Sequence, residues 1–142
     1  MNQKFPKYQL VDHTADAGIK VYGSNFAELF ANAALGLFEI IANLDKVNPI
    51  TERVIQVEAT DREALLVSWL SELNYFFLTE HEIYKEFHID EIIDTKMVAR
   101  VKGEDLDYDR HEIYTEVKAV TYHMLYIKET ARFWEAQVIF DL

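Results

Sequence analysis

The residues best suited to chemistry lie close together near the start of the chain, in the run Asp12-His13-Thr14-Ala15-Asp16. This run offers two carboxylates, an imidazole and a hydroxyl on a loop that leaves a predicted strand, where functional side chains are often mounted. Alternation along that strand places Asp12 on the face predicted to be packed, and a buried carboxylate requires a partner. That partner is a metal ion, a lysine or backbone amides. The alternative interpretation is that Asp12 or Asp16 caps a turn.

The end of the sequence offers a second group of oxygen donors. The last predicted strand, residues 132–142, alternates along its length and ends in Asp141-Leu142. The side-chain carboxylate of Asp141 is therefore expected beside the α-carboxylate of Leu142. Adjacent negative groups repel each other unless a cation neutralises them, and donor sets made of oxygen suit Ca²⁺ or Mg²⁺. The alternative is a frayed, solvated terminus, which the aromatic residues of this strand argue against.

The third group is the strand-like run Lys118-Ala119-Val120-Thr121-Tyr122-His123. Alternation predicts that Thr121 and His123 share one face, with Lys118 and Tyr122 on the other. The sequence contains no nucleophile and base at a recognised motif spacing, and no Gly-rich phosphate loop, HExxH or EF-hand pattern. The three groups therefore favour a binding site over a stand-alone enzyme.

The remaining polar residues are interpreted as solvent-facing. Three histidines lie among Glu and Asp and are predicted to be at the surface: His81, His88 and His111. The acidic run Asp105, Asp107, Asp109 could bind a cation, but it lacks the glycine and terminal Glu of an EF-hand loop. A solvated loop is expected there.

The elements that must position these groups follow from hydrophobic periodicity. Ser24 or Asn25, with Glu28 in capping-box position, begins a helix whose apolar residues recur at helical spacing to Ile41. A second capping box, Thr60-Asp61-Arg62-Glu63, begins another helix. Strands are predicted at residues 8–12, 18–22, 53–59, 86–93, 97–102, 116–128 and 132–142. Two helices among mostly antiparallel strands predict an α+β fold with the helices packed on a sheet.

The composition limits the class of protein. The chain has 142 residues, half of them hydrophobic, and is expected to form a single domain spanning 1–142. Its net charge of -11 disfavours direct binding to nucleic acid or an anionic membrane. The absence of cysteine excludes disulfides and thiolate chemistry. The first residues lack the apolar core of a signal peptide, which predicts a soluble, cytoplasmic protein.

In combination and order, the motifs resemble the archease family. These motifs are the early Asp-His-Thr-Ala-Asp followed by Gly18, then Lys-Ala-Val-Thr-Tyr-His, and the final Phe-Asp-Leu. The similarity continues through the helix near Phe26 and the run 65–73, so it covers essentially the whole chain.

This resemblance implies a function. Archeases are small protein cofactors of the RtcB-type tRNA-splicing RNA ligase, which joins RNA ends with GTP and a divalent metal. Such a cofactor is not itself an enzyme; it promotes guanylylation of the ligase, allows repeated turnover and broadens the choice of nucleotide. The alternative within the family is a chaperone or adaptor that modulates a tRNA-modifying enzyme such as a tRNA methyltransferase. A metal-dependent hydrolase built on Asp12, His13, Asp16 and Asp141 is a further alternative, without a recognisable nucleophile or base.

The resemblance also implies a metal site, because the two key aspartates of the family match Asp12 and Asp141. If the two strand ends meet, these carboxylates and the α-carboxylate of Leu142 are expected to hold one cation. Oxygen donors predict Ca²⁺ first, with Mg²⁺ or Mn²⁺ possible, over Zn²⁺. Further residues are expected to support the ligating carboxylates through hydrogen bonds or to face the partner: His13, Thr14, Asp16, Lys118, Thr121 and His123.

Overall fold

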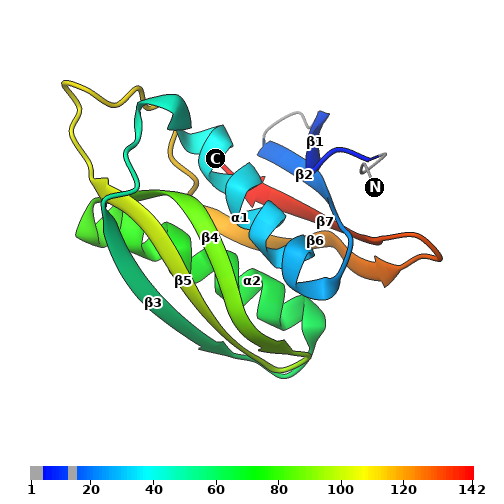
Figure 1. Cartoon of the computed structure of the whole chain (residues 1–142). Helices are drawn as coiled ribbons and strands as arrows, with labels where there is room; N and C mark the ends of the chain where they lie inside the picture. The colour runs from blue at the N-terminus through cyan, green and yellow to red at the C-terminus, as the bar shows by residue number, and fades with distance from the viewer. Residues whose placement is uncertain (1–4, 13–15) are drawn as a thin grey trace.

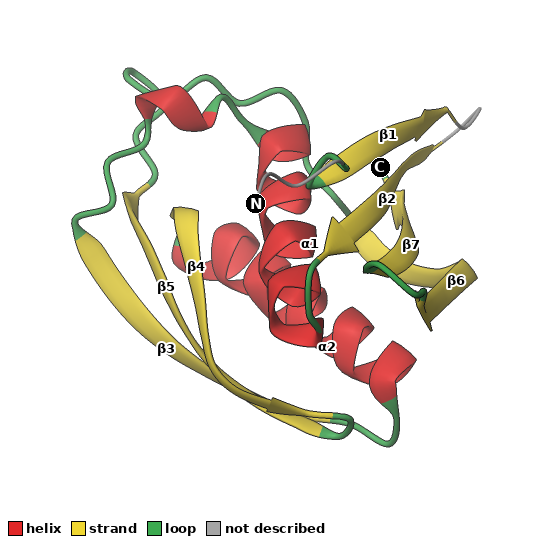
Figure 2. Ribbon diagram, turned by 45° about the vertical axis from the view of Figure 1, so that its right-hand side comes forward, coloured by secondary structure: helices red, strands yellow, loops and turns green. Residues whose placement is uncertain are grey.

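In the computed structural model, two antiparallel sheets enclose two helices (Figures 1 and 2). The structure describes residues 5–12 and 16–142, without the side chain of Asp12. The four-stranded sheet has the order β1-β2-β7-β6; these strands span Tyr8–Asp12, Asp16–Gly23, Trp134–Asp141 and Ala119–Glu129. The three-stranded sheet has the order β3-β5-β4; these strands span Thr51–Glu58, Lys96–Asp105 and Glu82–Ile93. The α+β prediction is confirmed.

Helix α1, Phe26–Ile41, begins where its capping residues predict. The side chain of Asn25 accepts a hydrogen bond from the Glu28 amide at 2.8 Å, which satisfies one of the free N–H groups of the first turn. The helix is buried on most of its circumference because the two sheets cover it from both sides. Ala31 and Leu35 are partly exposed, and Glu39 is exposed.

Helix α2, Arg62–Tyr75, is capped by Asp61, which accepts from the Ala64 amide at 2.8 Å. The predicted capping box placed Thr60 at this position, one residue too early. Asp61, not Thr60, is the residue directly before the first turn of the helix, and its negative charge suits the helix N-terminus. A short π-helical turn, Phe76–Glu80, extends α2. Neither helix in the described residues is long and apolar enough to cross a membrane.

The core lies where the helices meet the inner faces of both sheets. Trp69 of α2 is fully buried and donates its indole N–H to the carbonyl of Phe30 in α1 at 3.0 Å. Phe38 of α1 stacks on Phe87 of β4, with ring centroids 5.8 Å apart. These contacts fix α1 against α2 and against the three-stranded sheet.

The structure corrects several predicted strand bounds. β4 begins at Glu82 rather than at residue 86, and β5 ends at Asp105 rather than at residue 102, so Glu104 lies inside β5. β6 begins at Ala119 rather than residue 116. Residues 106–118 form a long connection, here called the arch, from β5 to β6 (yellow to orange in Figure 1).

Candidate metal and partner site at one end of the four-stranded sheet

The topology brings the two sequence-distant acidic motifs to the same end of one sheet. β1 and β7 are both antiparallel to β2, which lies between them, so β1 and β7 run in the same direction. Asp12 at the end of β1 and Asp141 at the end of β7 therefore lie at the same end of the sheet, with β2 between them. In the register, Asp12 is opposite Ala17 and Asp16 is opposite Asp141. His13 and Thr14 lie outside the described residues.

The register also separates the two faces of the sheet at this end. Asp16 and Asp141 are directly opposed in one row, and Ala17 and Phe140 are directly opposed in the next. Directly opposed residues of an antiparallel sheet share a face, and Phe140 is fully buried, so the row of Asp16 and Asp141 faces away from the helices.

The last strand is ordered to its end. Asp141 is exposed and is paired on one side with Asp16 and on the other with Ala119. The amide of Lys118 donates to the carbonyl of Asp141 at 2.7 Å. The side chain of Leu142 is half-buried against the hydrophobic core. These contacts fix the backbone of Asp141, while its carboxylate remains accessible.

The third motif lies beside this end, but it is not a regular strand. Thr121 is opposite Ile139 and donates its hydroxyl to the Ile139 carbonyl at 2.8 Å. The register then jumps from Thr121 to Tyr126, and the residues between form a bulge. The amide of His123 donates to the Thr121 hydroxyl at 3.2 Å, and His123 is exposed. The simple alternation predicted for Thr121 and His123 therefore ends at the bulge.

A contact from the neighbouring strand holds the bulge in place. Gln137, which is buried, donates its side-chain amide to the carbonyl of Met124 at 2.9 Å. Met124 has a φ of 54°, in the left-handed region that favours glycine. Tyr122 and Met124 are both exposed as a result. The bulge thus presents His123 and two large side chains to solvent close to the site.

Gly18, which follows the first motif, leaves room for a neighbouring side chain. A Cβ at this position would lie 2.6 Å from Cδ1 of Ile139, which is buried on the same face. The missing side chain lets Ile139 lie over β2, two residues before Asp141. A glycine at this point of the motif therefore has a packing role at the site.

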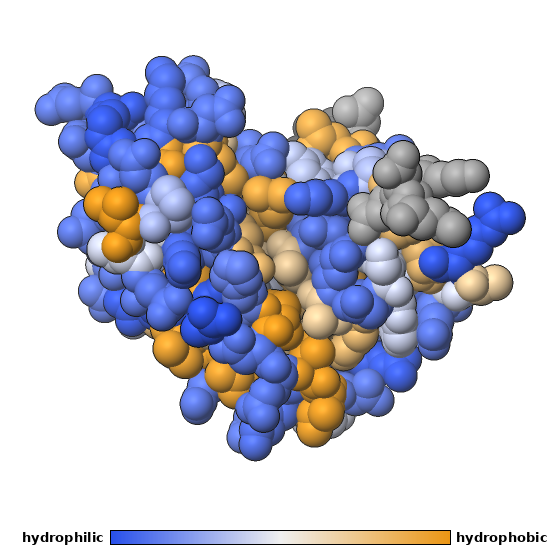
Figure 3. Space-filling view, in the orientation of Figure 1, coloured by the Kyte–Doolittle hydropathy of each residue, from blue (hydrophilic) through white to orange (hydrophobic). Residues whose placement is uncertain are grey.

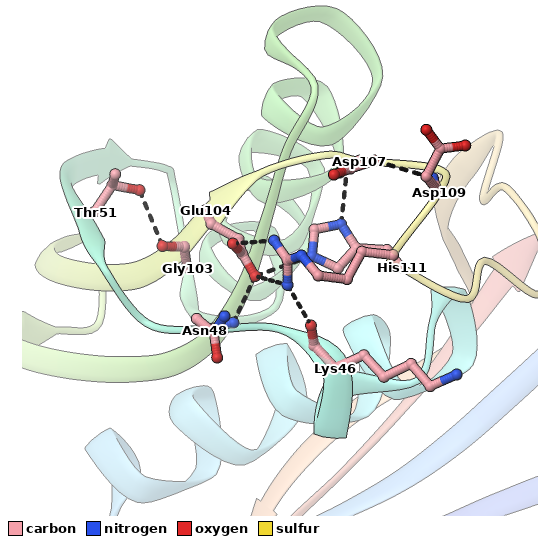
Figure 4. A network of polar contacts seen from close by, with 9 residues as sticks. Lys46, Asn48, Thr51, Gly103, Glu104, Asp107, Asp109 and His111 are labelled. Atoms are coloured by element: carbon pink, nitrogen blue, oxygen red, sulfur yellow. Dashed lines mark hydrogen bonds and ion pairs between the residues drawn. The ribbon is translucent and has the colours of Figure 1, made fainter.

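A buried ionic network anchors the arch that leads into the site (Figure 4). Glu104 accepts hydrogen bonds from Arg110 at 3.0 Å, from the amide of Asn48 at 2.6 Å, and contacts His111 at 2.9 Å. The hydrogen bond from Arg110 is the main reason that the pKa of Glu104 is lowered to about 2, and the contacts with Asn48 and His111 lower it as well. The prediction that His111 is a surface residue is wrong, because its side chain is fully buried against Glu104. The expectation of a solvated stretch holds for Asp105, Asp107 and Asp109.

The described side chains alone do not make a metal site. Among residues 5–11 and 16–142, no three His, Asp or Glu side chains are placed to hold one ion. Asp16 and Asp141 supply two carboxylates at the sheet end, and the side chain of Asp12 and all of His13 are not described. The carboxylates at this end supply oxygen atoms, which are the ligands that Ca²⁺ and Mg²⁺ prefer. The predicted metal site therefore stays a prediction, for which the topology supplies the position.

The model of the archease protein family matches residues 8–142. The chain belongs to the archease family. It is 39% identical over 146 residues to the protein archease of Methanosarcina barkeri, with both chains fully covered. It is also 39% identical over 141 residues to that of Thermococcus gammatolerans, covering 96% of this chain and 99% of the relative.

Two solved structures share the archease fold. The solution structure of protein 1598 from Methanobacterium thermoautotrophicum has a TM-score of 0.78 and 36% identity, covering 96% of this chain and 99% of that one. The crystal structure of an archease from Thermotoga maritima, described as a possible chaperone, has a TM-score of 0.65. It is 20% identical over 100% of this chain and 99% of that one, which supports the fold alone.

Some residues that shape this archease site carry no signal in the sequence. Gln137 holds the β6 bulge from thirteen residues away, and Asn48 reaches Glu104 from 56 residues away. A glutamine in an alternating strand and an asparagine in a loop are ordinary residues. Only the folded chain shows what they contact.

Proposed function

We propose that this protein is a non-catalytic activator of an RtcB-type tRNA-splicing ligase in the cytoplasm. It promotes the metal- and GTP-dependent guanylylation of the ligase and thereby multiple turnover. Two observations support this proposal: membership of the archease family, and the placement of the Asp12 and Asp141 strand ends at the same end of one sheet. The second observation carries it, because the motif residues converge although they are far apart in the sequence.

The acidic sheet end is proposed to hold a divalent cation. Asp12, Asp141 and the α-carboxylate of Leu142 supply oxygen donors, with Ca²⁺ the expected ion and Mg²⁺ or Mn²⁺ the alternatives. When bound, such a cation supplies positive charge that can organise phosphate oxygens. The residues of this chain fix the donors: the Lys118 amide holds the backbone of Asp141, and the Thr121 hydroxyl holds that of Ile139. His13, Thr14, Asp16 and His123 are proposed to support the carboxylates or to face the ligase.

The charge of the molecule supports action on the enzyme rather than on RNA. A net charge of -11 repels a phosphate backbone but attracts the basic groove with which a ligase binds RNA or nucleotide. The transferred nucleotide develops charge on phosphate oxygens, which positioned groups can stabilise. A small acidic protein bound at that groove can therefore act without a nucleophile of its own.

A reconstituted ligation assay tests the proposal. Substoichiometric amounts of the wild-type protein are expected to raise the number of ligations per ligase molecule, with accumulation of guanylylated ligase. Asp141→Asn and Asp12→Asn are expected to lower this stimulation by roughly tenfold or more, since each removes a charged oxygen donor. Asp109→Asn, an exposed residue of the arch, is the matched control and should stimulate normally. Absence of stimulation at every metal and GTP concentration would refute the proposal.

A chaperone or adaptor for a tRNA-modifying enzyme is the second candidate, favoured by the description of the Thermotoga maritima structure as a possible chaperone. Such a protein needs an interaction surface but no cation. Its function should survive both aspartate substitutions provided that the circular dichroism spectra and melting temperatures stay unchanged. The same two variants therefore distinguish the two functions.

A further inference from the structure

Asn74, close to the end of helix α2, is a buried amide in a helix whose other buried side chains are hydrophobic. It is 5% exposed, and its Nδ2 donates to the carbonyl of Val117 at 2.7 Å. Its Oδ1 is buried and accepts no hydrogen bond from the described residues. Asparagine favours helices poorly, and a buried oxygen without a partner is unfavourable. The bond to Val117 is therefore the contact that offsets the presence of an amide at this position.

That bond ends on a peptide group that also contacts the acidic sheet end. The carbonyl of Val117 and the amide of Lys118 belong to the same planar unit, and they point in opposite directions because the peptide is trans. On one side the carbonyl accepts from Asn74, and on the other the amide donates to the carbonyl of Asp141 at 2.7 Å. Each hydrogen bond polarises the peptide group and so strengthens the other. A single rigid unit thus connects α2 to Asp141.

This peptide group lies where the arch turns from the surface into the interior. The outer part of the arch belongs to the hydrophilic region at the upper left of Figure 3, in the orientation of Figure 1, whereas Val117 is fully buried. Residues 114–118 belong to no helix or strand. No ladder of strand hydrogen bonds therefore sets the position of Lys118, and the side chain of Asn74 supplies a bond that does.

The bond from Lys118 also closes the end of the four-stranded sheet. It lies just beyond the last register pair of β6 and β7, which is Ala119 with Asp141. Asp141 is the last residue of β7. The end of a strand frays unless a further contact ties it down, so the group that places Lys118 also determines how firmly Asp141 is held.

We propose that Asn74 is a positioning residue for Asp141. Acting through the peptide between Val117 and Lys118, it holds the end of β7, and with it the Asp141 carboxylate, where activation of the ligase requires it. This inference rests on the proposed function, in which Asp141 is an oxygen donor. Asn74 does not itself contact the partner or a cation, because its side chain is buried.

Asn74→Leu tests the inference, because leucine has a similar size but cannot donate to Val117. Apolar burial and better helix propensity offset the lost bond, so the urea midpoint should change little. In the ¹⁵N-labelled full-length protein, the amide proton of Lys118 should move to higher field, since its hydrogen bond to Asp141 weakens. Hydrogen exchange at this amide should become roughly tenfold faster, and the amide signals of Asp141 and Leu142 should shift. If all these signals stay as in the wild type, the buried side chain of Val117 places the peptide by itself and the proposal is overturned.

Two further variants separate positioning from stability. Val67 is buried on the same face of α2, about 10 Å before Asn74 along the helix axis. Val67→Ala removes apolar contacts and should lower the urea midpoint, while the Lys118 amide proton keeps its wild-type shift. Asn74→Ala removes the same donor as Asn74→Leu without its bulk and should move the Lys118 signal in the same direction. If Val67→Ala moves that signal equally, or if neither Asn74 variant folds, Asn74 supports the fold in general and the proposal fails.

The ligation assay supplies the functional measurement. Asn74→Leu should lower the stimulation of guanylylation by roughly tenfold, because a small displacement of a positioned group is enough for such a loss. Val67→Ala should stimulate as the wild type does at a temperature where both are folded. A displaced Asp141 with undiminished stimulation would overturn the proposal and leave the proposed function intact. If the wild-type protein gives no stimulation, the proposed function fails, and the Lys118 and Asp141 signals alone decide whether Asn74 positions the sheet end.

Discussion

Glu104 is the residue on which the position of the arch most depends. Its carboxylate is buried and holds the neighbours Arg110 and His111 together with the amide of Asn48, which is distant from them in the chain. A carboxylate that accepts several hydrogen bonds, one of them from a guanidinium, is stabilised in its charged form. Replacing it with glutamine removes the negative charge and one of the two acceptor oxygens that Arg110 and the Asn48 amide use, although Arg110 keeps its bond to the Lys46 carbonyl.

We expect Glu104→Gln to lower the free energy of unfolding at pH 7 by about 2 kcal/mol, measured by urea denaturation. The pKa of Glu104 is lowered from 4.5 to about 2 in the folded protein. Its contribution to stability is therefore complete above pH 4.5 and is lost as the pH falls toward 2. The difference between wild type and variant should shrink over that interval. Asp90→Asn, which breaks an exposed pair with Arg100, is the control and should show little effect.

At the scale of elements, local signals in the sequence were sufficient for the helices and most strands. Asn25 and Glu28 are three residues apart, so the start of α1 could be predicted from the sequence. The β6 bulge could not, because it depends on Gln137 in the next strand, thirteen residues beyond Met124. The burial of His111 depends equally on Glu104, so a histidine among acidic neighbours was interpreted as exposed. The candidate site was predictable as three motifs, while its position required the strand order.

The bulge of β6 can be tested through its backbone. Met124 adopts a left-handed conformation, which costs a residue with a Cβ about 1 kcal/mol relative to glycine. Met124→Gly is therefore expected to be about 1 kcal/mol more stable than Met124→Ala, which removes the same exposed side chain but keeps the Cβ. Thermal or urea unfolding of the two variants measures the difference. A glycine variant less stable than the alanine variant would show that φ at this position does not limit the bulge.

At the scale of the whole molecule, the excess of acidic residues has two opposite consequences. The 25 Asp and Glu residues stand against 14 Lys and Arg, and most of them are at the surface. Like charges on a folded surface repel each other, which destabilises the compact state. The same field attracts a basic surface on the proposed ligase partner. Both effects act through solvent, so salt screens both.

Raising the salt concentration is therefore expected to stabilise the isolated protein and to weaken its association with the ligase. Between about 0.05 M and 0.5 M KCl, the melting temperature of the isolated protein should rise, because its self-repulsion is screened. Over the same range, its affinity for the ligase should fall by roughly tenfold, chiefly through a slower association rate. Stopped-flow binding and calorimetry measure the two quantities at constant divalent ion. An affinity independent of salt would mean that apolar contacts, rather than the acidic surface, hold the complex together.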